Sequence, residues 1–129
     1  MIKIDGKEYQ VAVTEVSLDT EFLYKYATRT ENFDLSYELG GVFLNQEIKL
    51  GVENSENDDF VAVYRLLSSK STIDNGTGHN VQIWTPMGKM TFLMYPNKVE
   101  VDLYKERGTK TWWNEMTVKF IAVKPVESL

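Results

Sequence analysis

The sequence predicts a mainly β fold, an antiparallel β-sandwich or partly closed barrel with one flanking α-helix at about residues 58–70. Most of the chain alternates apolar and polar residues with a period of two, which is typical of strands. Turn signals such as Asp5-Gly6 separate these runs, so hairpins can supply the connections. One segment has helical spacing instead. The resulting order of strands, helix and further strands predicts a sandwich or a partly closed barrel.

Length and composition predict a single domain, residues 1–129, that folds without disulfide bonds. A chain of 129 residues can bury roughly two thirds of the surface that its unfolded form exposes. It contains no cysteine, which excludes disulfides, thiolate metal ligands and thiol nucleophiles. It has neither an apolar leader nor an uncharged run near the roughly 18 residues of a spanning helix, so we expect a soluble protein with no membrane partner.

Acidic residues outnumber basic residues, and they are unevenly placed. The net charge of −5 argues against specific binding to nucleic acid or to an anionic membrane. Residues 1–64 have a net charge of −8, and residues 65–129 have a net charge of +3. This asymmetry has two interpretations. Either it is chance, with strands of both halves mixed on every face, or acidic and basic surfaces of neighbouring copies meet in a head-to-tail assembly.

The N-terminal region predicts a hairpin followed by a change of phase. Ile2 and Ile4 precede the Asp5-Gly6 turn, and apolar residues continue on one face from Tyr9 to Val13. Residues 16 and 18 are apolar in the opposite phase. A bulge or a strand break near residues 14–15 would absorb this slip.

Two further strands are predicted at residues 22–26 and 33–39, where large apolar residues alternate with smaller or polar ones. The pair Gly40-Gly41 then interrupts the alternation, either to close a hairpin or to allow a close backbone approach. The alternation resumes at Val42 and predicts a long strand that ends near Gly51.

Residues 58–70 predict a helix of about three turns. Its apolar positions recur at helical spacing and predict an aromatic stripe packed on a sheet: Phe60, Val63, Tyr64 and Leu67. Asp58 and Asp59 suit the positive N-terminal end as capping residues, and Lys70 suits the C-terminal end.

The C-terminal half predicts four more strands. After a turn at residues 74–78, the alternation marks them at residues 81–83, 90–94, 99–103 and 112–122. Turn signals separate them at residues 86–88, 96–97 and 106–108.

Two adjacent tryptophans begin the last strand, where neighbouring residues face opposite ways. Trp112 is in phase with the apolar Met116 and Val118, so it is predicted to face the core, and Trp113 is predicted to face outward. A one-residue bulge near Asn114 would exchange these roles. The candidate interface residues are aromatic: Trp113, Trp84 and Tyr37.

No combination of residues predicts a catalytic, cofactor-binding or metal site, so we expect a protein that is not an enzyme. His79 has neither a cysteine nor a second histidine to join it, and the glycine turn before it predicts a loop or strand-edge position. The oxygen-rich residues 53–59 lack the ordered spacing and the central glycine of a calcium loop. A hydrolase with two unrecognised carboxylates stays open and would need an enclosed polar cleft.

The C-terminal segment WWNEMTVKFIAVKP, residues 112–125, resembles the closing strand of small tail proteins of long-tailed phages and prophages. The preceding order is similar to theirs as well: the hairpin IKIDGKEY, the strand ending IKLGV, the helix DDFVAVYRLLSSK and the strand pair HNVQIWTPMGKMTFLMYP. The resemblance covers most of the chain as order and pattern, without a sharply diagnostic motif.

The resemblance implies a tail-tube-like fold whose copies join sheet to sheet into a ring, often a hexamer, around a channel. It implies a virion structural protein, a tail-tube, distal-tail or tail-completion component, that binds itself and other tail proteins. Such a protein assembles in the cytoplasm of the bacterial host and becomes part of the virion tail. An acidic balance would suit a lumen through which DNA slides. The family brings no catalytic residue, cofactor or metal.

This chain departs from the family pattern in its short length and in the lack of an obvious long inter-ring loop. The alternative function is a small binding module for carbohydrate or another amphipathic ligand, with exposed Trp113, Trp84 or tyrosines as the stacking surface. The assembly hypothesis, in contrast, requires no small-molecule substrate.

Overall fold

The computed structural model describes residues 1–29, 35–51, 53–54, 56–69 and 78–126, without the side chains of residues 25–29, 35–38 and 54. In order along the chain, the elements are β1 (Ile2–Ile4), β2 (Lys7–Tyr9), β3 (Val13–Arg29), β4 (Leu35–Leu50), β5 (Glu53–Asn54), α1 (Asp58–Leu67), β6 (His79–Thr85), β7 (Gly88–Glu100), β8 (Leu103–Arg107), β9 (Lys110–Trp113) and β10 (Met116–Ala122). Strands make up most of the described residues, which confirms the predicted mainly β class.

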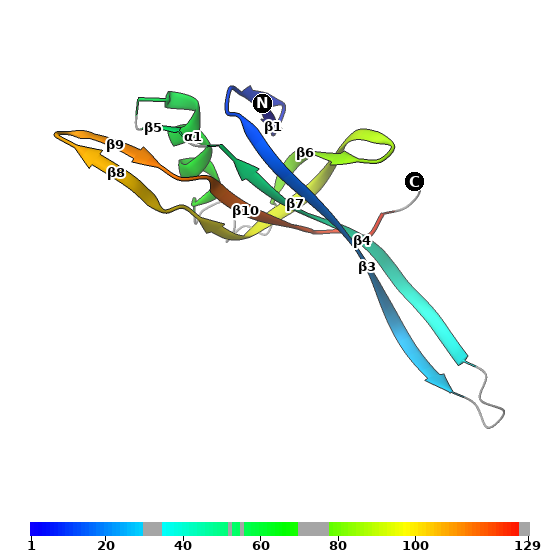
Figure 1. Ribbon diagram of the computed structural model, residues 1–129. Coiled ribbons are helices and arrows are strands. Elements are labelled where there is room, and N and C mark those ends of the chain that lie inside the picture. The colour runs from blue at the N-terminus through cyan, green and yellow to red at the C-terminus, as the bar shows by residue number, and fades with distance from the viewer. Residues whose placement is uncertain (30–34, 52, 55, 70–77, 127–129) are drawn as a thin grey trace.

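The strands form two antiparallel sheets (Figure 1). The larger sheet has seven strands in the order β2-β1-β6-β7-β10-β4-β3 and is not closed. The smaller sheet has the order β5-β9-β8. The last strand, β10, lies inside the larger sheet between β7 and β4, so the two halves of the chain are joined by its hydrogen bonds. Strand β3 forms one edge of that sheet.

The larger sheet curls, and one side chain bridges the curl. Gln46 of β4 donates a hydrogen bond from Nε2 to the Trp84 carbonyl (2.8 Å) and accepts one at Oε1 from the Trp84 amide (3.0 Å). Strands β4 and β6 are separated by two other strands in the sheet order. The sheet must therefore bend until β4 and β6 approach each other, which fits the predicted partly closed barrel.

The hydrophobic core fills the inside of this curl. Ile48, Val81 and Val118 contribute fully buried side chains from three strands of the sheet. The helix packs against β2 and β7 and contributes Phe60 and Val63. The predicted alternation of the last strand is confirmed over β10, whose inward residues are all buried: Met116, Val118, Phe120 and Ala122.

The predicted N-terminal hairpin is confirmed. Strands β1 and β2 pair around Asp5-Gly6, and both turn residues have positive φ angles, 53° and 83°. That geometry is the type I′ turn, which matches the twist of paired strands and favours Asp-Gly.

The long strands β3 and β4 correct the predicted division of residues 13–50. The expected slip near residues 14–15 is confirmed as a register shift between Val13 and Glu15. However, β3 continues for 17 residues and β4 for 16, where the alternation predicted several shorter strands. The predicted strands merge because β3 and β4 stay paired across a single long hairpin, with three register shifts along it.

Gly40-Gly41 does not end a strand, so the hairpin interpretation of this pair is wrong. It lies within β4, and the close-approach interpretation holds for Gly41. A Cβ atom at Gly41 would lie 2.9 Å from the Cβ of Pro125. Glycine is therefore required here because the C-terminal segment crosses β4 at this point, where the Val126 amide donates to the Val42 carbonyl (2.7 Å).

The predicted helix is confirmed with different ends and a different cap. Helix α1 ends at Leu67, and Lys70 lies outside the described residues. Asn57 is the N-cap, and its side chain accepts a hydrogen bond from the Phe60 amide (3.1 Å). Asp58 and Asp59 occupy the first turn instead, where their charge suits the helix dipole. Tyr64, predicted in the buried stripe, is exposed.

Two predicted turns have different outcomes. Pro86-Met87 joins β6 to β7 as predicted, and Pro96-Asn97 does not turn the chain. Pro96 is buried within β7 opposite Phe120, beside a register shift that accommodates a residue without an amide proton. Most of the predicted turn at residues 74–78 lies outside the described part of the chain.

Candidate functional site

The distal part of the β3–β4 hairpin, residues 22–29 and 35–41, is called the arm. It extends away from the rest of the molecule (Figure 1). Strand β4 pairs with β10 only from Leu50 to Gln46, and the last backbone bond to another segment is at Val42. Among the described residues, the arm therefore has no third strand beside it. A two-stranded hairpin alone is marginally stable in water.

Apolar side chains on the arm are exposed to solvent. Phe22 is 54% exposed and Leu39 is 45% exposed, and Leu23 and Tyr24 are exposed as well. Phe22 and Leu23 are consecutive in a strand, so both faces of the arm present apolar surface. Clustered exposed apolar residues are typical of interaction sites.

The outer edge of β3 has no partner strand in the described part of the chain, because β3 is the last strand of its sheet. Monomeric proteins usually shorten, bulge or cover such edges. This edge is 17 residues long and has a register shift near its start and two more near Leu23 and Tyr24. The intervening stretch is free to pair with another chain.

One exposed ion pair lies at the base of β3. Lys49 Nζ lies 3.2 Å from Glu15 Oε2, across the shifted register. The hydrogen bond and the charge of Glu15 raise the pKa of Lys49 above its ordinary value. The contribution of the lysine charge to stability is therefore present at neutral pH and is lost as the pH rises through the raised pKa of Lys49.

A second apolar feature lies at the other end of the molecule. This groove of about 280 Å³, called the Trp113 groove, is lined by Phe60, Val61, Tyr64, Val101 and Trp113. Tyr64 is 45% exposed. Leu103 pairs directly opposite Trp113 and is 50% exposed, so it extends the same apolar face. The helix and the small sheet thus form a shallow apolar surface together.

The predicted orientations of the two tryptophans are wrong. Trp113 packs against the hydrophobic core, whereas Trp112 lies beneath two ammonium groups, Lys105 at 4.5 Å and Lys110 at 5.1 Å from its ring centroid. Strand β9 ends at Trp113 and β10 begins at Met116. The interruption at Asn114 shifts the phase of alternation, and this is the irregularity that would exchange the two roles.

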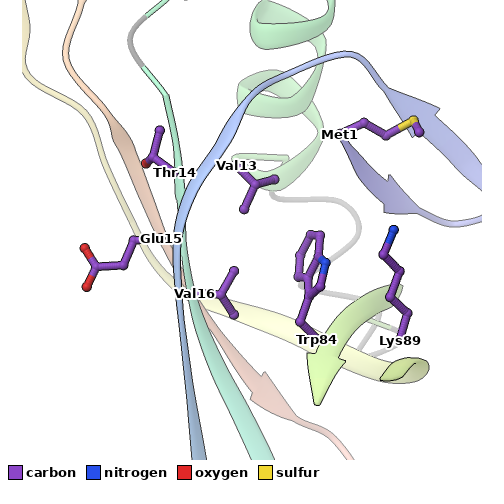
Figure 2. Close-up of a pocket in the computed structure, with 7 residues that line it drawn as sticks. All are labelled: Met1, Val13, Thr14, Glu15, Val16, Trp84 and Lys89. Carbon is purple, nitrogen blue, oxygen red and sulfur yellow. The ribbon is translucent and has the colours of Figure 1, made fainter. Parts of the chain in front are cut away.

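Trp84 lies in a separate hollow of about 380 Å³ between β3 and the β6–β7 hairpin (Figure 2). Val13 and Val16 face the indole, and Lys89 lies beside it with Nζ 5.9 Å from the ring centroid. Thr14 and Glu15 point to the other side of β3. Trp84 is half-buried and packs against the core, so only part of its ring is available to a ligand.

The third candidate interface residue, Tyr37, is in β4 and pairs with Ala27 in the arm. Its side chain lies outside the part of the chain that the structure describes. The three candidates therefore belong to three places: the Trp113 groove, the Trp84 hollow and the arm.

His79 is not the loop or edge residue that was predicted. It is 2% exposed, and its Nδ1 lies 2.8 Å from Asp5 Oδ2. A carboxylate only accepts hydrogen bonds, so Nδ1 holds the proton. Asp5 also accepts the Asn80 amide (2.8 Å), which connects the first hairpin to β6. His79 Nε2 is buried without a hydrogen-bond partner among the described residues.

The described residues contain no group of three or more His, Cys, Asp or Glu side chains placed to hold a metal ion. Two carboxylates, Asp19 and Glu47, line one small hollow on the outer face of the sheet together with Lys119. Both carboxylates are exposed, so this hollow is not the enclosed polar cleft that a hydrolase would need.

No family model matches the chain, and neither a curated protein nor a solved structure matches it. In the described residues, no helix has the length and apolar character needed to cross a membrane. The function is therefore inferred from the surfaces of this chain alone.

Proposed function

We propose that the protein is a non-enzymatic structural protein that assembles with copies of itself into a ring or tube. The observation that supports this most directly is the arm. Its two strands extend beyond the core with apolar residues exposed on both faces, and the outer edge of β3 lacks a partner among the described residues. Burial of this surface in an assembly would stabilise a hairpin that is marginal alone.

Within this proposal, the assembly is a component of a phage or prophage tail. The mainly β fold with one helix is consistent with the tail-tube-like architecture that the sequence resembles. The sequence shows no long inter-ring loop, but the arm supplies a projection that could reach a neighbouring copy or ring. Other tail proteins are then its partners, and the acidic balance suits a lumen that does not retain DNA.

Light scattering coupled to size exclusion tests the proposal on the complete chain. We expect a mass that rises above the 14.9 kDa of one chain as concentration increases. Electron microscopy of the concentrated fractions should show rings or short tubes. Co-expression with the products of neighbouring genes extends the test to assemblies that need a partner to nucleate. A monomer under all these conditions would overturn the proposal.

A ligand-binding module is the second candidate function, and the Trp84 hollow favours it. The hollow combines an aromatic ring with the ammonium of Lys89. Stacking on an indole is a common way to hold a sugar or another flat ligand. Tryptophan fluorescence measured against a panel of glycans tests this function. A spectral shift that the Trp84→Phe variant no longer shows would support it, and no shift with any glycan would remove it.

A further inference from the structure

We propose that the arm of one copy lies in the Trp113 groove of a second copy of this chain. The inference rests on the proposed self-assembly and specifies its contact. It names a head-to-tail interface in which the two partners use different surfaces.

The two surfaces lie at opposite ends of the molecule. In Figure 1 the β3–β4 hairpin extends toward the lower right, and the β8–β9 hairpin next to α1 extends toward the upper left. An arm therefore cannot reach the groove of its own chain. A second copy placed in line brings one arm to one groove and leaves a free arm and a free groove at the ends.

The two surfaces have complementary apolar character. The arm offers a row of side chains on one face, because Phe22 and Tyr24 alternate along β3 and Leu39 pairs opposite Tyr24. The groove offers a shallow apolar surface made by Tyr64, Trp113 and Leu103. Aromatic residues at the centre of a contact contribute most of the binding energy in many interfaces.

The charges around the two surfaces are complementary as well. The base of the β3–β4 hairpin, residues 13–21 and 42–50, includes four acidic residues and one basic residue, a net charge of −3, whereas the arm itself is close to neutral. Residues 103–110 of the β8–β9 hairpin include three basic residues and one acidic residue, a net charge of +2. Lys110 is paired with Glu56 within the chain (3.3 Å). Lys105 and Arg107 remain to attract an acidic partner and to select a head-to-tail orientation.

A contact between two different surfaces repeats without limit unless the rotation between copies closes a ring. This inference therefore accounts for a ring or a tube rather than a two-fold dimer. It also places the unpaired edge of β3 beside the exposed edge strand β8 of the neighbour, where both edges could be covered.

Cysteine cross-linking tests the contact directly, because the natural chain contains no cysteine. Phe22→Cys labels the arm and Tyr64→Cys labels the groove, with Leu103→Cys as a second groove variant. Met87→Cys is the matched control, since Met87 is 60% exposed on the β6–β7 turn and belongs to neither surface. Pairs of variants are mixed and treated with a short bismaleimide, and covalent dimers are quantified by denaturing electrophoresis.

The arm variant should couple to either groove variant at least about tenfold more than to the Met87→Cys control, because docking raises the effective concentration of the two thiols. Equal coupling to the control would overturn the inference. Strong coupling of Phe22→Cys to itself would overturn it in favour of a two-fold contact between arms.

Light scattering of the natural chain separates the failure of this contact from the failure of the proposed self-assembly. If that chain assembles without coupling between arm and groove, only the proposed contact fails, and if it stays monomeric, the proposed function fails as well.

Discussion

At the scale of single residues, the two adjacent tryptophans have different energetic roles. Trp113 packs against the core and lines the groove, whereas Trp112 packs beneath the Lys105 and Lys110 ammonium groups. Trp113→Ala should lower the free energy of unfolding by about 2–4 kcal/mol, since it opens a cavity beside the core. Trp112→Ala should lower it by about 1 kcal/mol, in line with a cation–π contact at a half-exposed site. Urea denaturation followed by circular dichroism measures both values.

The order of the two effects is the informative result. A larger loss for Trp112→Ala would mean that the alternation from β10 continues unbroken into β9 and that Trp112 faces the core. That outcome would restore the orientation predicted from the sequence and would remove Trp113 from the wall of the groove.

Gln46 is a buried polar residue whose two hydrogen bonds hold the curl of the sheet. Gln46→Leu keeps the volume of the side chain nearly unchanged but leaves the Trp84 amide and carbonyl without these hydrogen-bond partners. We expect the free energy of unfolding to fall by about 2–4 kcal/mol, because a desolvated and unpaired polar group is costly. Gln82→Leu is the matched control, since the Gln82 side chain forms no hydrogen bond within the described residues, and it should change stability by about 0.5 kcal/mol or less. Equal effects of the two substitutions in urea denaturation would contradict a bridging role for Gln46.

At the scale of elements, the crossing of β4 by the C-terminal segment depends on Gly41. A Cβ atom there would meet Pro125 at 2.9 Å. Gly41→Ala should therefore cost about 1–2 kcal/mol, as expected for overpacking. The measurement is a double-mutant cycle in urea with Pro125→Gly, which removes the Cβ that Gly41→Ala would strike. The double variant should lose less stability than the sum of the single losses. Strict additivity would show that the crossing tolerates the extra methyl group.

Much of the fold could be predicted because its local signals are strong. Asp5-Gly6 specifies a type I′ turn, and the phase change between Val13 and Val16 requires a bulge. The apolar spacing from Phe60 to Leu67 indicates the helix, and the alternation of β10 indicates its buried face. In each case, the information lies within about ten residues of sequence.

The remaining features depend on partners that are distant in sequence. Gly40-Gly41 and Pro96 are local signals for a break, yet both lie within continuous strands. Strand β4 continues past Gly40-Gly41 because it stays paired with β3 on both sides of them. A bulge beside β10 accommodates Pro96. His79 is buried where Asp5, 74 residues earlier, accepts a hydrogen bond from its Nδ1. No pattern in a window of sequence identifies such pairs.

The sequence pattern did not predict the projecting arm, because local alternation does not show whether a core surrounds a strand. Alternation in residues 22–26 and 33–39 predicted strands with one buried face, but the arm extends beyond the body and both of its faces are solvated. One signal was present, since Phe22, Leu23 and Tyr24 form a continuous apolar run rather than a strict alternation. Such a run in a strand indicates apolar surface on both faces, here on an element without a core around it.

At the scale of the whole molecule, the two ends of the chain's fold differ in shape and in charge. A hairpin with an acidic base extends in one direction and a basic hairpin extends in the other. The arm, the groove and the open edge of β3 are surfaces that a single copy leaves exposed. Head-to-tail contact between copies would cover all three and would form a continuous structure from one small chain.

The central claim is that exposed apolar residues of the arm drive self-assembly. The most direct measurement is light scattering of the natural chain beside the variant with Phe22→Thr and Leu39→Thr, which retains β propensity and removes apolar surface. Met87→Thr, on the β6–β7 turn, is the matched control. We expect the natural chain and the control to form species of several times 14.9 kDa, and the arm variant to remain at that mass. Equal masses for the natural chain and the arm variant at every concentration would contradict the claim.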